Sequence, residues 1–387
     1  MKIVIDARMY GPRRWTGIGR YLQHLVAELE QLDTTNQYVV LVGRENWDDY
    51  VPGAPNFTKL LSPALPYSPG EQLQLAWQLA RLRPDVVHFA APNAPLLYLG
   101  RRVTTVHDLT LLMYSTARGE GFEKWLHDAK KLPFQMVLWR GARGSQALIT
   151  PTEYVKRQLV QRYDVPPQRV TVTPEAMDEG QTPAGAEGAD LIGALGLVAG
   201  NYILHVGNCY PYKNVDRLVE AFSEVVGTRA GVKLVLVGRD DYFRDLVRRK
   251  VAALKLGERV VFTGAVSDEE LAQLYAQAAL YVNPSLSEGF GLQGLEAMAA
   301  GVPVLAARAS CLPEVYADAA EYFDPGSTAE LVTKTAALLR DDKLRLTLTT
   351  RGLKRVTEFS WRAAAEATLA VYQAAGAGGV RIRKQQA

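Results

Sequence analysis

Two acidic side chains flank a glycine-rich turn within residues 287–304, SEGFGLQGLEAMAAGVPV. Glu288 directly precedes the turn 289–291, and a helix that we expect to begin at about Leu292 carries Glu296 in its first turns. The N-terminus of a helix presents unpaired N–H groups that bind phosphate, and carboxylates accept hydrogen bonds from vicinal hydroxyls. This pattern fits a ligand with both phosphate and hydroxyl groups. The alternative is a helix whose acids only offset its dipole.

A second pair of glycines, Gly17 and Gly19, lies in the segment TGIGRY, which we expect to be a loop directly before a helix. The pair does not complete the dinucleotide-binding pattern G-x-G-x-x-G, because position 22 is Leu. The sequence therefore argues against binding of NAD.

Short apolar runs alternate with helical patterns along most of the chain, which predicts parallel sheets covered by helices. The first group of expected strands comprises Lys2–Asp6, Tyr38–Gly43, Asp85–Phe89, Val103–Asp108, Ala147–Thr150 and Arg169–Thr173. The second group comprises Tyr202–Gly207, Lys233–Gly238, Arg259–Gly264, Leu280–Ser285, Val302–Ala307 and Glu321–Asp324. The fold class is therefore α/β, with two Rossmann-like domains in tandem. Ligands of such sheets bind beyond the carboxyl ends of the strands, so we expect a cleft lined by the loops that follow them.

The domain boundaries follow from the break between the two groups. We expect an N-terminal domain over residues 1–177 and a Gly- and Ala-rich linker over 178–200. A C-terminal domain covers 201–360, and a last helix with a basic tail covers 361–387 and either extends the second domain or returns to the first.

Composition excludes several classes of protein. The chain has 387 residues, 48% hydrophobic and 22% charged, which is typical of a globular protein with about two domains. A net charge of +3 is too balanced for binding nucleic acid over the whole surface. Two cysteines exclude a disulfide scaffold, and no long apolar segment or signal peptide is present, so we expect a cytoplasmic protein.

The segment 288–296 resembles the E-x7-E motif of retaining glycosyltransferases of family 4, which have the two-domain GT-B fold. The similarity extends through GFGLQGLEAMAAGVPV and departs at Gln293, where proline is common in the family. It implies that Glu288 contacts the donor sugar and that Glu296 holds the ribose hydroxyls of the nucleotide. The turn residues Gly289, Phe290, Gly291 and Leu292 are then expected to lie against the donor.

Other segments resemble the same family. The loop HVGNCYPYKN is similar to a donor-phosphate loop, which implies that Lys213 neutralises the diphosphate. Many members carry an arginine where this chain has Asn208, so a second cation is missing there, and Arg239 is a candidate replacement. The sequence HDL after an expected strand implies that His107 is the active-site histidine beside the donor sugar; without the resemblance, it would be interpreted as a structural strand-end histidine. Gly17 and Gly19 look like the family's glycine loop near the donor phosphates.

The resemblance implies transfer of a sugar from a nucleotide diphosphate with retained configuration, assisted by cations and helix N–H groups around the leaving phosphate. We expect no metal and no other cofactor, because the sequence has no Asp-x-Asp and no His/Cys cluster with metal-ligand spacing. GDP-mannose is our first donor hypothesis, and the expected acceptor is a glycan or a lipid-linked glycan.

A basic stretch suggests one further partner. Residues 101–170 carry twelve basic and six acidic residues, and cations alternate with Trp125, Phe134, Met136 and Trp139 within 122–143. This mixture could bind anionic lipid headgroups on the inner membrane face. The alternative is an ordinary helix with a solvated basic face, which the interruption at Pro133 favours. His88, before the loop FAAPNAP, is a weaker candidate for the acceptor site.

Two alternative functions stay open at this stage. One is an epimerase or phosphorylase of the GT-B fold that uses the same kind of cleft without a glycan acceptor. The other is a nucleotide-sugar-binding module without catalysis, for which the missing cation at Asn208 is the best argument.

Overall fold

The computed structural model describes residues 1–11, 16–118, 131–177, 191–227 and 229–377. Its contacts divide the described chain into two compact units, each of which has its own sheet. Unit 1 contains the described residues of 1–109, 131–175 and 360–377. Unit 2 contains 110–118 and the described residues between 176 and 359.

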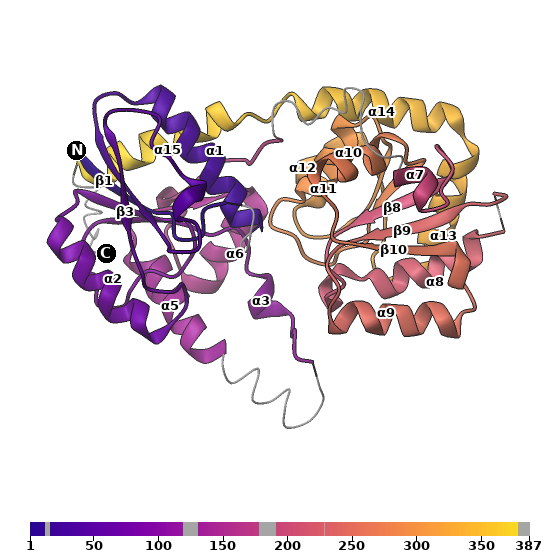
Figure 1. The fold of residues 1–387 in the computed structure, drawn as a ribbon, viewed down its shortest axis with the longest axis horizontal. Helices are drawn as coiled ribbons and strands as arrows, with labels where there is room; N and C mark the ends of the chain where they lie inside the picture. The colour runs from indigo at the N-terminus through magenta and orange to yellow at the C-terminus, as the bar shows by residue number, and fades with distance from the viewer. Residues whose placement is uncertain (12–15, 119–130, 178–190, 228, 378–387) are drawn as a thin grey trace, which may run out of the picture. The chain divides into compact units, whose positions relative to one another are not determined.

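The sheet of unit 1 has seven parallel strands in the order β3-β2-β1-β4-β5-β6-β7 (Figure 1). They are β1 (Lys2–Asp6), β2 (Gln37–Val42), β3 (Phe57–Leu61), β4 (Val86–Phe89), β5 (Arg102–Thr105), β6 (Ala147–Thr150) and β7 (Val170–Val172). Strands β1 and β4 are buried almost throughout, as strands covered on both faces must be. This explains why unbroken apolar runs predicted them.

Strand β3 is the one strand of this sheet that the apolar runs did not predict. It lies at the edge of the sheet, and only Phe57 of its five residues is buried. An edge strand needs few apolar residues, and Lys59 interrupts the run at its centre. Its weak pattern therefore follows from its position.

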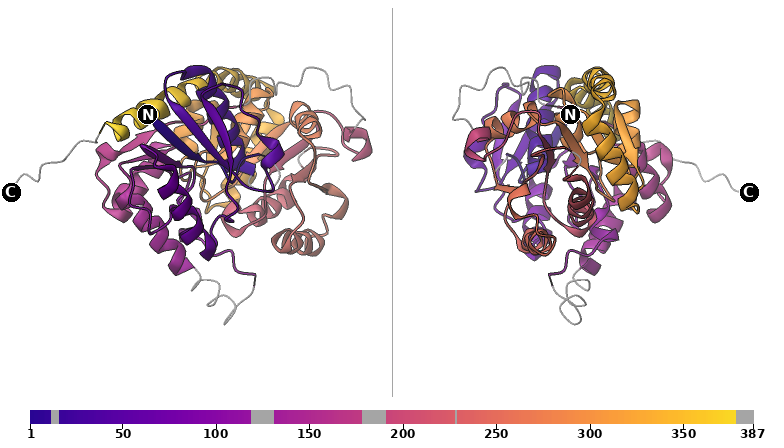
Figure 2. Two further views of the ribbon diagram at one scale, coloured as in Figure 1. Left: turned by 60° about the vertical axis from the view of Figure 1, so that its left-hand side comes forward. Right: turned by 90° about the vertical axis from the view of Figure 1, so that its right-hand side faces the viewer.

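Helices cover both faces of this sheet. Helices α1 (Thr16–Leu32) and α15 (Trp361–Gly376) pack against each other on one side, and α2 (Pro69–Leu82) and α5 (Lys131–Gly144) lie on the other (Figure 1). Helix α6 (Glu153–Tyr163) packs against α5, β6 and β7. The views of Figure 2 likewise show yellow α15 beside the indigo elements of unit 1. The chain thus ends its described part in the unit where it began.

The local sequence defines the ends of α2. The Ser68 hydroxyl accepts a hydrogen bond from the Glu71 N–H at the first turn, and Pro69 occupies the first helical position, where its missing N–H costs nothing. Leu75 and Leu79 face a fully buried cluster that includes Val4 and Phe89. These contacts hold α2 next to the carboxyl ends of β1 and β4.

The sheet of unit 2 has six parallel strands in the order β10-β9-β8-β11-β12-β13. They are β8 (Tyr202–Val206), β9 (Lys233–Val237), β10 (Val260–Gly264), β11 (Leu280–Asn283), β12 (Val304–Ala307) and β13 (Ala320–Phe323). The two parallel α/β sheets confirm the predicted fold class.

The helices of unit 2 alternate with its strands (Figure 1). They are α3 (Thr110–Met113), α7 (Leu191–Ala194), α8 (Val215–Val225), α9 (Tyr242–Ala253), α10 (Asp268–Ala276), α11 (Leu292–Ala299), α12 (Leu312–Tyr316), α13 (Thr328–Arg340) and α14 (Asp342–Val356). Residues 178–190 of the expected linker and 378–387 of the expected basic tail lie outside the described residues.

Candidate active site

In unit 2, the structure brings together two of the predicted residues, which are 75 positions apart in the sequence. Lys213 ends a short 3-10 helix after β8, and Glu288 lies in the loop between β11 and α11. The Lys213 Nζ donates to Glu288 Oε1 at 2.7 Å, and the two side chains are only 11% and 12% exposed. The Leu286 N–H also donates to the Tyr212 carbonyl at 2.7 Å, so the two loops are joined at both backbone and side-chain level.

The backbone of Glu288 is held from the opposite side by the start of α12. Its N–H donates to Ser310 Oγ at 3.0 Å, and its carbonyl accepts from the buried Cys311 Sγ at 3.3 Å. Burial raises the pKa of the Cys311 thiol, so this cysteine remains a neutral donor. These contacts fix the Glu288 loop independently of the lysine.

The turn before α11 depends on a tyrosine that the sequence did not reveal. Gly291 has φ +86°, and a Cβ on it would lie 2.7 Å from the Tyr316 hydroxyl oxygen. That hydroxyl donates to the Gly291 carbonyl at 2.6 Å and accepts from Asn283 Nδ2 at 3.2 Å. A Cβ on Gly294 would lie 2.3 Å from the same ring. The glycines therefore admit the Tyr316 side chain beneath the turn.

The other turn residues differ in their surroundings. Phe290 is buried and its ring packs edge-on against Phe359 at 5.4 Å, so its side chain belongs to the core and only its backbone can face a donor. Gly289 and Leu292 are half-buried. The expectation that this turn lies against the donor therefore concerns the backbone of Phe290.

Glu296 lies in the second turn of α11 and is mostly buried. The Tyr275 hydroxyl of α10 donates to its Oε2 at 2.9 Å. Burial, followed by the charge of Glu296, raises the pKa of Tyr275, so this phenol stays protonated and continues to donate. The charges of both Glu288 and Glu296 also act on buried Tyr281, whose pKa is raised mainly by burial. Both carboxylates therefore lie around the same part of unit 2.

Close backbone approach marks the carboxyl ends of β8 and β9. A Cβ on Gly238 would lie 2.2 Å from the Gly207 carbonyl oxygen, so only glycine fits there. Asn208 follows directly, and its Oδ1 accepts from the Tyr210 N–H at 3.2 Å. Asn208 thus stabilises its own loop, and Arg239 is exposed.

A second cation near these strand ends was missed by the sequence analysis. Arg244 on α9 is completely buried, and its Nη2 donates to the Leu236 carbonyl. Its Nε lies 3.2 Å from Asp240 Oδ1 as an ion pair, but neither Nε nor Nη1 has a hydrogen-bond partner among the described residues. Burial lowers the pKa of this guanidinium. Nothing in the local sequence distinguishes Arg244 from half-buried Arg248 and exposed Arg249 of the same helix.

In unit 1, His107 lies two residues beyond the end of β5 rather than within the expected longer strand. Its Nδ1 lies 2.9 Å from Glu175 Oε1 and its Nε2 lies 3.0 Å from the Ala90 carbonyl oxygen. Burial alone would lower the pKa of His107, but the hydrogen bond and the charge of Glu175 outweigh it and raise that pKa. The Tyr21 ring meets the imidazole edge-on at 4.8 Å. Glu175, 68 residues away, was not a sequence candidate.

His88 is fully buried, which removes it as a surface candidate for the acceptor. Its Nδ1 lies 2.6 Å from the Tyr372 hydroxyl and its Nε2 lies 2.8 Å from Thr105 Oγ1. Burial lowers the pKa of His88 to about 3. His88 is therefore a neutral structural residue that joins α15 to the sheet.

Gly17 and Gly19 lie inside the first turns of α1, not in a loop before it. A Cβ on Gly19 would lie 2.0 Å from the Gly11 carbonyl oxygen, whereas a Cβ on Gly17 would meet nothing within 4 Å. Gly19 thus permits the helix to pack on the segment after β1, and Gly17 is exposed.

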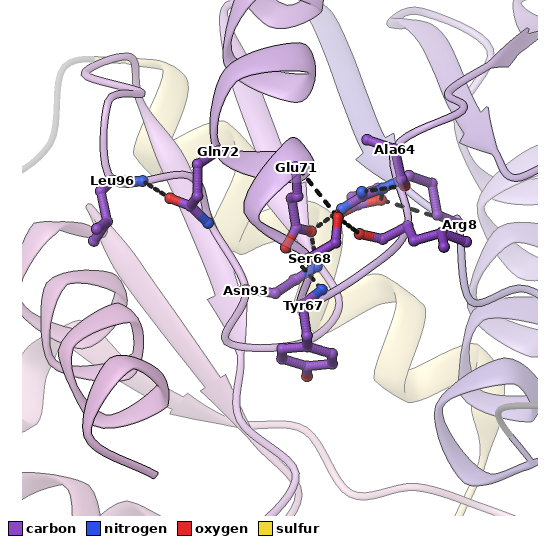
Figure 3. A network of polar contacts seen from close by, with 10 residues as sticks. Arg8, Ala64, Tyr67, Ser68, Glu71, Gln72, Asn93 and Leu96 are labelled. Carbon is purple, nitrogen blue, oxygen red and sulfur yellow. Dashed lines mark hydrogen bonds and ion pairs between the residues drawn. The ribbon is translucent and has the colours of Figure 1, made fainter. Parts of the chain in front are cut away.

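A buried polar network lies at the carboxyl ends of β1 and β4 (Figure 3). The Arg8 guanidinium donates to both carboxylate oxygens of Asp6 at 2.7 Å and also pairs with Glu71. Asn93 Nδ2 donates to Glu71 Oε1 at 2.7 Å, which ties the loop after β4 to α2. Burial raises the pKa of Glu71. Next to this network, a cavity of about 650 Å³ is lined by Arg8, Arg44, Asn46, Ser62 and Gln74, among others.

The described part of the expected lipid-binding segment exposes apolar side chains. On α5, Met136 is 63% exposed and Trp139 is 48% exposed, and the Arg143 guanidinium lies 5.6 Å from the Trp139 ring. Residues 119–130, and with them Trp125, lie outside the described residues. Across the described chain, no helix has the length and apolarity needed to cross a bilayer. The same residues contain no group of three or more His, Cys, Asp or Glu side chains arranged for a metal ion.

Two parallel α/β sheets in tandem are the architecture of the GT-B fold, and comparisons with known proteins identify the class of enzyme. Residues 15–181 match the family described as Glycosyltransferase Family 4, and residues 196–355 match Glycosyl transferases group 1. The chain is therefore a glycosyltransferase that belongs to family 4, as the sequence motifs predicted.

Individual relatives are similar over nearly the whole chain. The chain is 29% identical over 387 aligned positions to the O-antigen chain mannosyltransferase B of Escherichia coli, covering 92% of this chain and 96% of that protein. Its fold is similar to the sucrose-phosphate synthase tll1590 of Thermosynechococcus elongatus, with a TM-score of 0.76 and 21% identity over 98% of this chain and 100% of that one. It is also similar to Alr3699/HepE of Anabaena in complex with UDP and glucose, with a TM-score of 0.74 and 17% identity over 97% of this chain and 100% of that one.

Proposed function

We propose that the protein transfers a sugar from a nucleoside-diphosphate donor to a hydroxyl of a glycan or glycolipid, with retained configuration and without a metal ion. The observation that carries this proposal is the arrangement around the start of α11. There, Lys213, Glu288 and Glu296 come from three separate segments and are held by Ser310 and Tyr275. An ammonium, a helix N-terminus and two carboxylates are the groups that a diphosphate with hydroxyl-rich ends requires.

Each residue has a distinct role in this proposal. The Lys213 ammonium and the N–H groups at the start of α11 stabilise the negative charge that grows on the leaving diphosphate. Glu288 accepts hydrogen bonds from the sugar hydroxyls, and Glu296 accepts them from the ribose. Because Lys213 has three N–H donors, its bond to Glu288 leaves donors for the phosphate. The departing phosphate then assists removal of the acceptor proton.

GDP-mannose is the donor that we propose. The similarity to a mannosyltransferase over 92% of the chain supports mannose, whereas the structure of Alr3699/HepE was solved with UDP and glucose. The polar cavity beside Arg8 supports an acceptor site in unit 1, because neutral amide and hydroxyl groups such as Asn46, Ser62 and Gln74 suit sugar hydroxyls.

The test is an incubation with radiolabelled GDP-mannose, GDP-fucose, UDP-glucose and UDP-galactose, each with and without oligosaccharide and lipid-linked acceptors. We expect transfer from GDP-mannose only when an acceptor is present, unaffected by EDTA, and at least 100-fold slower in Glu288→Gln, the loss typical of removing one well-placed polar group. The exposed variant Glu220→Gln, in the same unit, is the control and should keep full activity.

Other outcomes would replace the proposal. Epimerised or phosphorolysed sugar without an acceptor would indicate the epimerase or phosphorylase alternative. Binding without turnover would indicate a binding module, and loss of turnover with a chelator would contradict the metal-free mechanism.

We also propose peripheral contact with an anionic membrane through the exposed face of α5. Met136 and Trp139 supply apolar area there, and Arg140 and Arg143 supply charge. The double variant Met136→Ser/Trp139→Ser should lose most of its co-sedimentation with vesicles containing phosphatidylglycerol. Leu353→Ser, an exposed apolar position on α14, is the control and should bind like the unaltered protein. Equal binding by the double variant would remove α5 as the contact surface.

A further inference from the structure

Both ring nitrogens of His107 face oxygens that can only accept a hydrogen bond. The Ala90 carbonyl oxygen lies 3.0 Å from Nε2, and Glu175 Oε1 lies 2.9 Å from Nδ1. A neutral imidazole has one N–H and one lone pair, so it can satisfy only one of these two oxygens when Glu175 is ionised. An imidazolium donates to both of them. The geometry therefore selects the doubly protonated ring.

The same contacts would also form if the proton sat on the Glu175 carboxyl group and that group donated to Nδ1. The intrinsic proton affinities oppose this arrangement, because imidazole in water binds a proton about 2 pK units more tightly than a glutamate carboxylate. The His107 and Glu175 side chains are 16% and 10% exposed, so neither ion is completely removed from water. The proton thus belongs on the imidazole.

The other groups around His107 are consistent with a cation. Asp108, next in the chain, is exposed and favours the charged ring. Tyr21 packs edge-on against the ring, and burial raises the pKa of its phenol, so it stays neutral. Burial, followed by the charge of His107, lowers the pKa of His88, so His88 stays neutral.

Two other histidines show by contrast what a neutral ring looks like in this protein. The partners of His88 are the hydroxyls of Tyr372 and Thr105, which can donate or accept as a neutral ring requires. His205 donates from Nδ1 to the Val282 carbonyl at 3.0 Å, and its Nε2 has no partner among the described residues. Burial lowers the pKa of His205 to about 4. Only His107 among these three lies between two acceptors.

We propose that Glu175 is a positioning residue that keeps His107 as an imidazolium, so that His107 acts in the reaction as a fixed cation, with both N–H groups held by Glu175 and Ala90, and not as a general base. The chain passes out of unit 1 after Leu109 and again after Glu175. The ion pair between His107 and Glu175 therefore also links these two points of unit 1. The protonation state follows from this geometry and from the intrinsic proton affinities, whereas its part in sugar transfer rests on the proposed function.

Nitrogen NMR of the full-length protein tests the protonation state without any assay of activity. In long-range ¹H–¹⁵N spectra of uniformly ¹⁵N-labelled protein at pH 7.5, both ring nitrogens of His107 should have the shifts of protonated nitrogens, and His88 and His205 should be neutral. The His107→Gln spectrum supplies the assignment. A neutral His107 ring at this pH, or a proton located on Glu175, would overturn the proposal.

Matched variants test the part played by Glu175. The Gln amide can donate to Nδ1, so Glu175→Gln can accommodate a neutral ring, and it should lower the pKa of His107 by about 1–3 units. Glu175→Asp should retain part of the effect, and Asp108→Asn should cause a smaller shift than Glu175→Gln. An unchanged His107 pKa in Glu175→Gln would refute the role of Glu175.

The pH profile of transfer from GDP-mannose then tests the link to the reaction. In Glu175→Gln, the alkaline loss of kcat/KM should move to lower pH by the same amount as the NMR titration of His107, and Glu175→Asp should restore part of it. If NMR shows a protonated His107 in the unaltered protein and a neutral His107 in Glu175→Gln, but the pH profile of kcat/KM does not move, the role of the His107 cation in transfer is refuted. The protonation state of His107 is then still established. If no nucleotide sugar is turned over at all, the proposed function fails and the NMR result still decides the protonation state.

Discussion

The ion pair between Lys213 and Glu288 leads to a double-mutant cycle with a defined outcome. The perturbations are Lys213→Met, which keeps the length of the side chain, Glu288→Gln, and the two together. Both side chains are nearly nine-tenths buried and their atoms are 2.7 Å apart, so removal of one partner leaves a charge with little access to water. Such single removals cost about 3–5 kcal/mol in buried pairs.

Because about a tenth of each side chain remains exposed, we expect a value near the lower limit, about 3 kcal/mol of unfolding free energy for each single variant. Independent effects would then add to about 6 kcal/mol in the double variant. The double variant leaves no unpaired charge, so it should lose no more than about 3 kcal/mol, which gives a coupling energy of at least about 3 kcal/mol.

Urea unfolding at pH 7, followed by circular dichroism and by tryptophan fluorescence, measures these differences. The control is the pair between Lys250 and Glu220 in the same unit, whose side chains are 28% and 44% exposed. The corresponding variants Lys250→Met and Glu220→Gln should each cost no more than about 1 kcal/mol. If Lys213→Met and Glu288→Gln also cost less than about 1 kcal/mol each and their effects add, the two residues do not form the desolvated pair described here.

Two further predictions concern stability. Gly19→Ala should lower the free energy of unfolding by about 1–3 kcal/mol, because its Cβ would lie 2.0 Å from the Gly11 carbonyl oxygen. Gly17→Ala has open space around it, so it should leave the free energy of unfolding unchanged or raise it by up to about 1 kcal/mol. Equal effects of the two substitutions in thermal unfolding would contradict this reasoning. Burial lowers the pKa of His88 to about 3 and that of His205 to about 4 in the folded protein, whereas both have a pKa of about 6.5 in the unfolded chain. Below about pH 6.5 the unfolded chain therefore binds more protons than the folded protein, and the free energy of unfolding decreases as the pH is lowered. From pH 6 to pH 5 these two groups should remove roughly 2–3 kcal/mol, and a flat urea-unfolding profile over that range would show that the two rings are not buried in neutral form.

The sequence predicted most of the parallel strands because strands covered by helices on both faces consist of continuous runs of apolar residues. The same reasoning missed β3, which lies at an edge and buries only Phe57. It also placed Gly17 and Gly19 in a loop, although packing against the segment after β1 carries the helix through both glycines. Local propensity was overridden by tertiary contact in that case.

The site shows the same division between local and long-range information. Glu288, Glu296 and Lys213 lie in segments that resemble family motifs, so the sequence indicated them. Tyr316 and Glu175 lie far along the chain from the residues that they hold, and neither occurs in a motif. Only a three-dimensional arrangement could show that Tyr316 fills the space beneath Gly291 or that Glu175 meets His107.

The most direct test of the account is calorimetric titration of the protein and of its Glu296→Gln variant with GDP-mannose and with UDP-glucose. We expect GDP-mannose to bind the unaltered protein and to bind the variant roughly 10- to 100-fold more weakly, since a hydrogen bond to a charged group contributes about 1.5–3 kcal/mol. Equal affinity of the two proteins for the donor that binds would contradict the assignment of Glu296, and failure of both donors to bind would contradict the proposed donor site in unit 2.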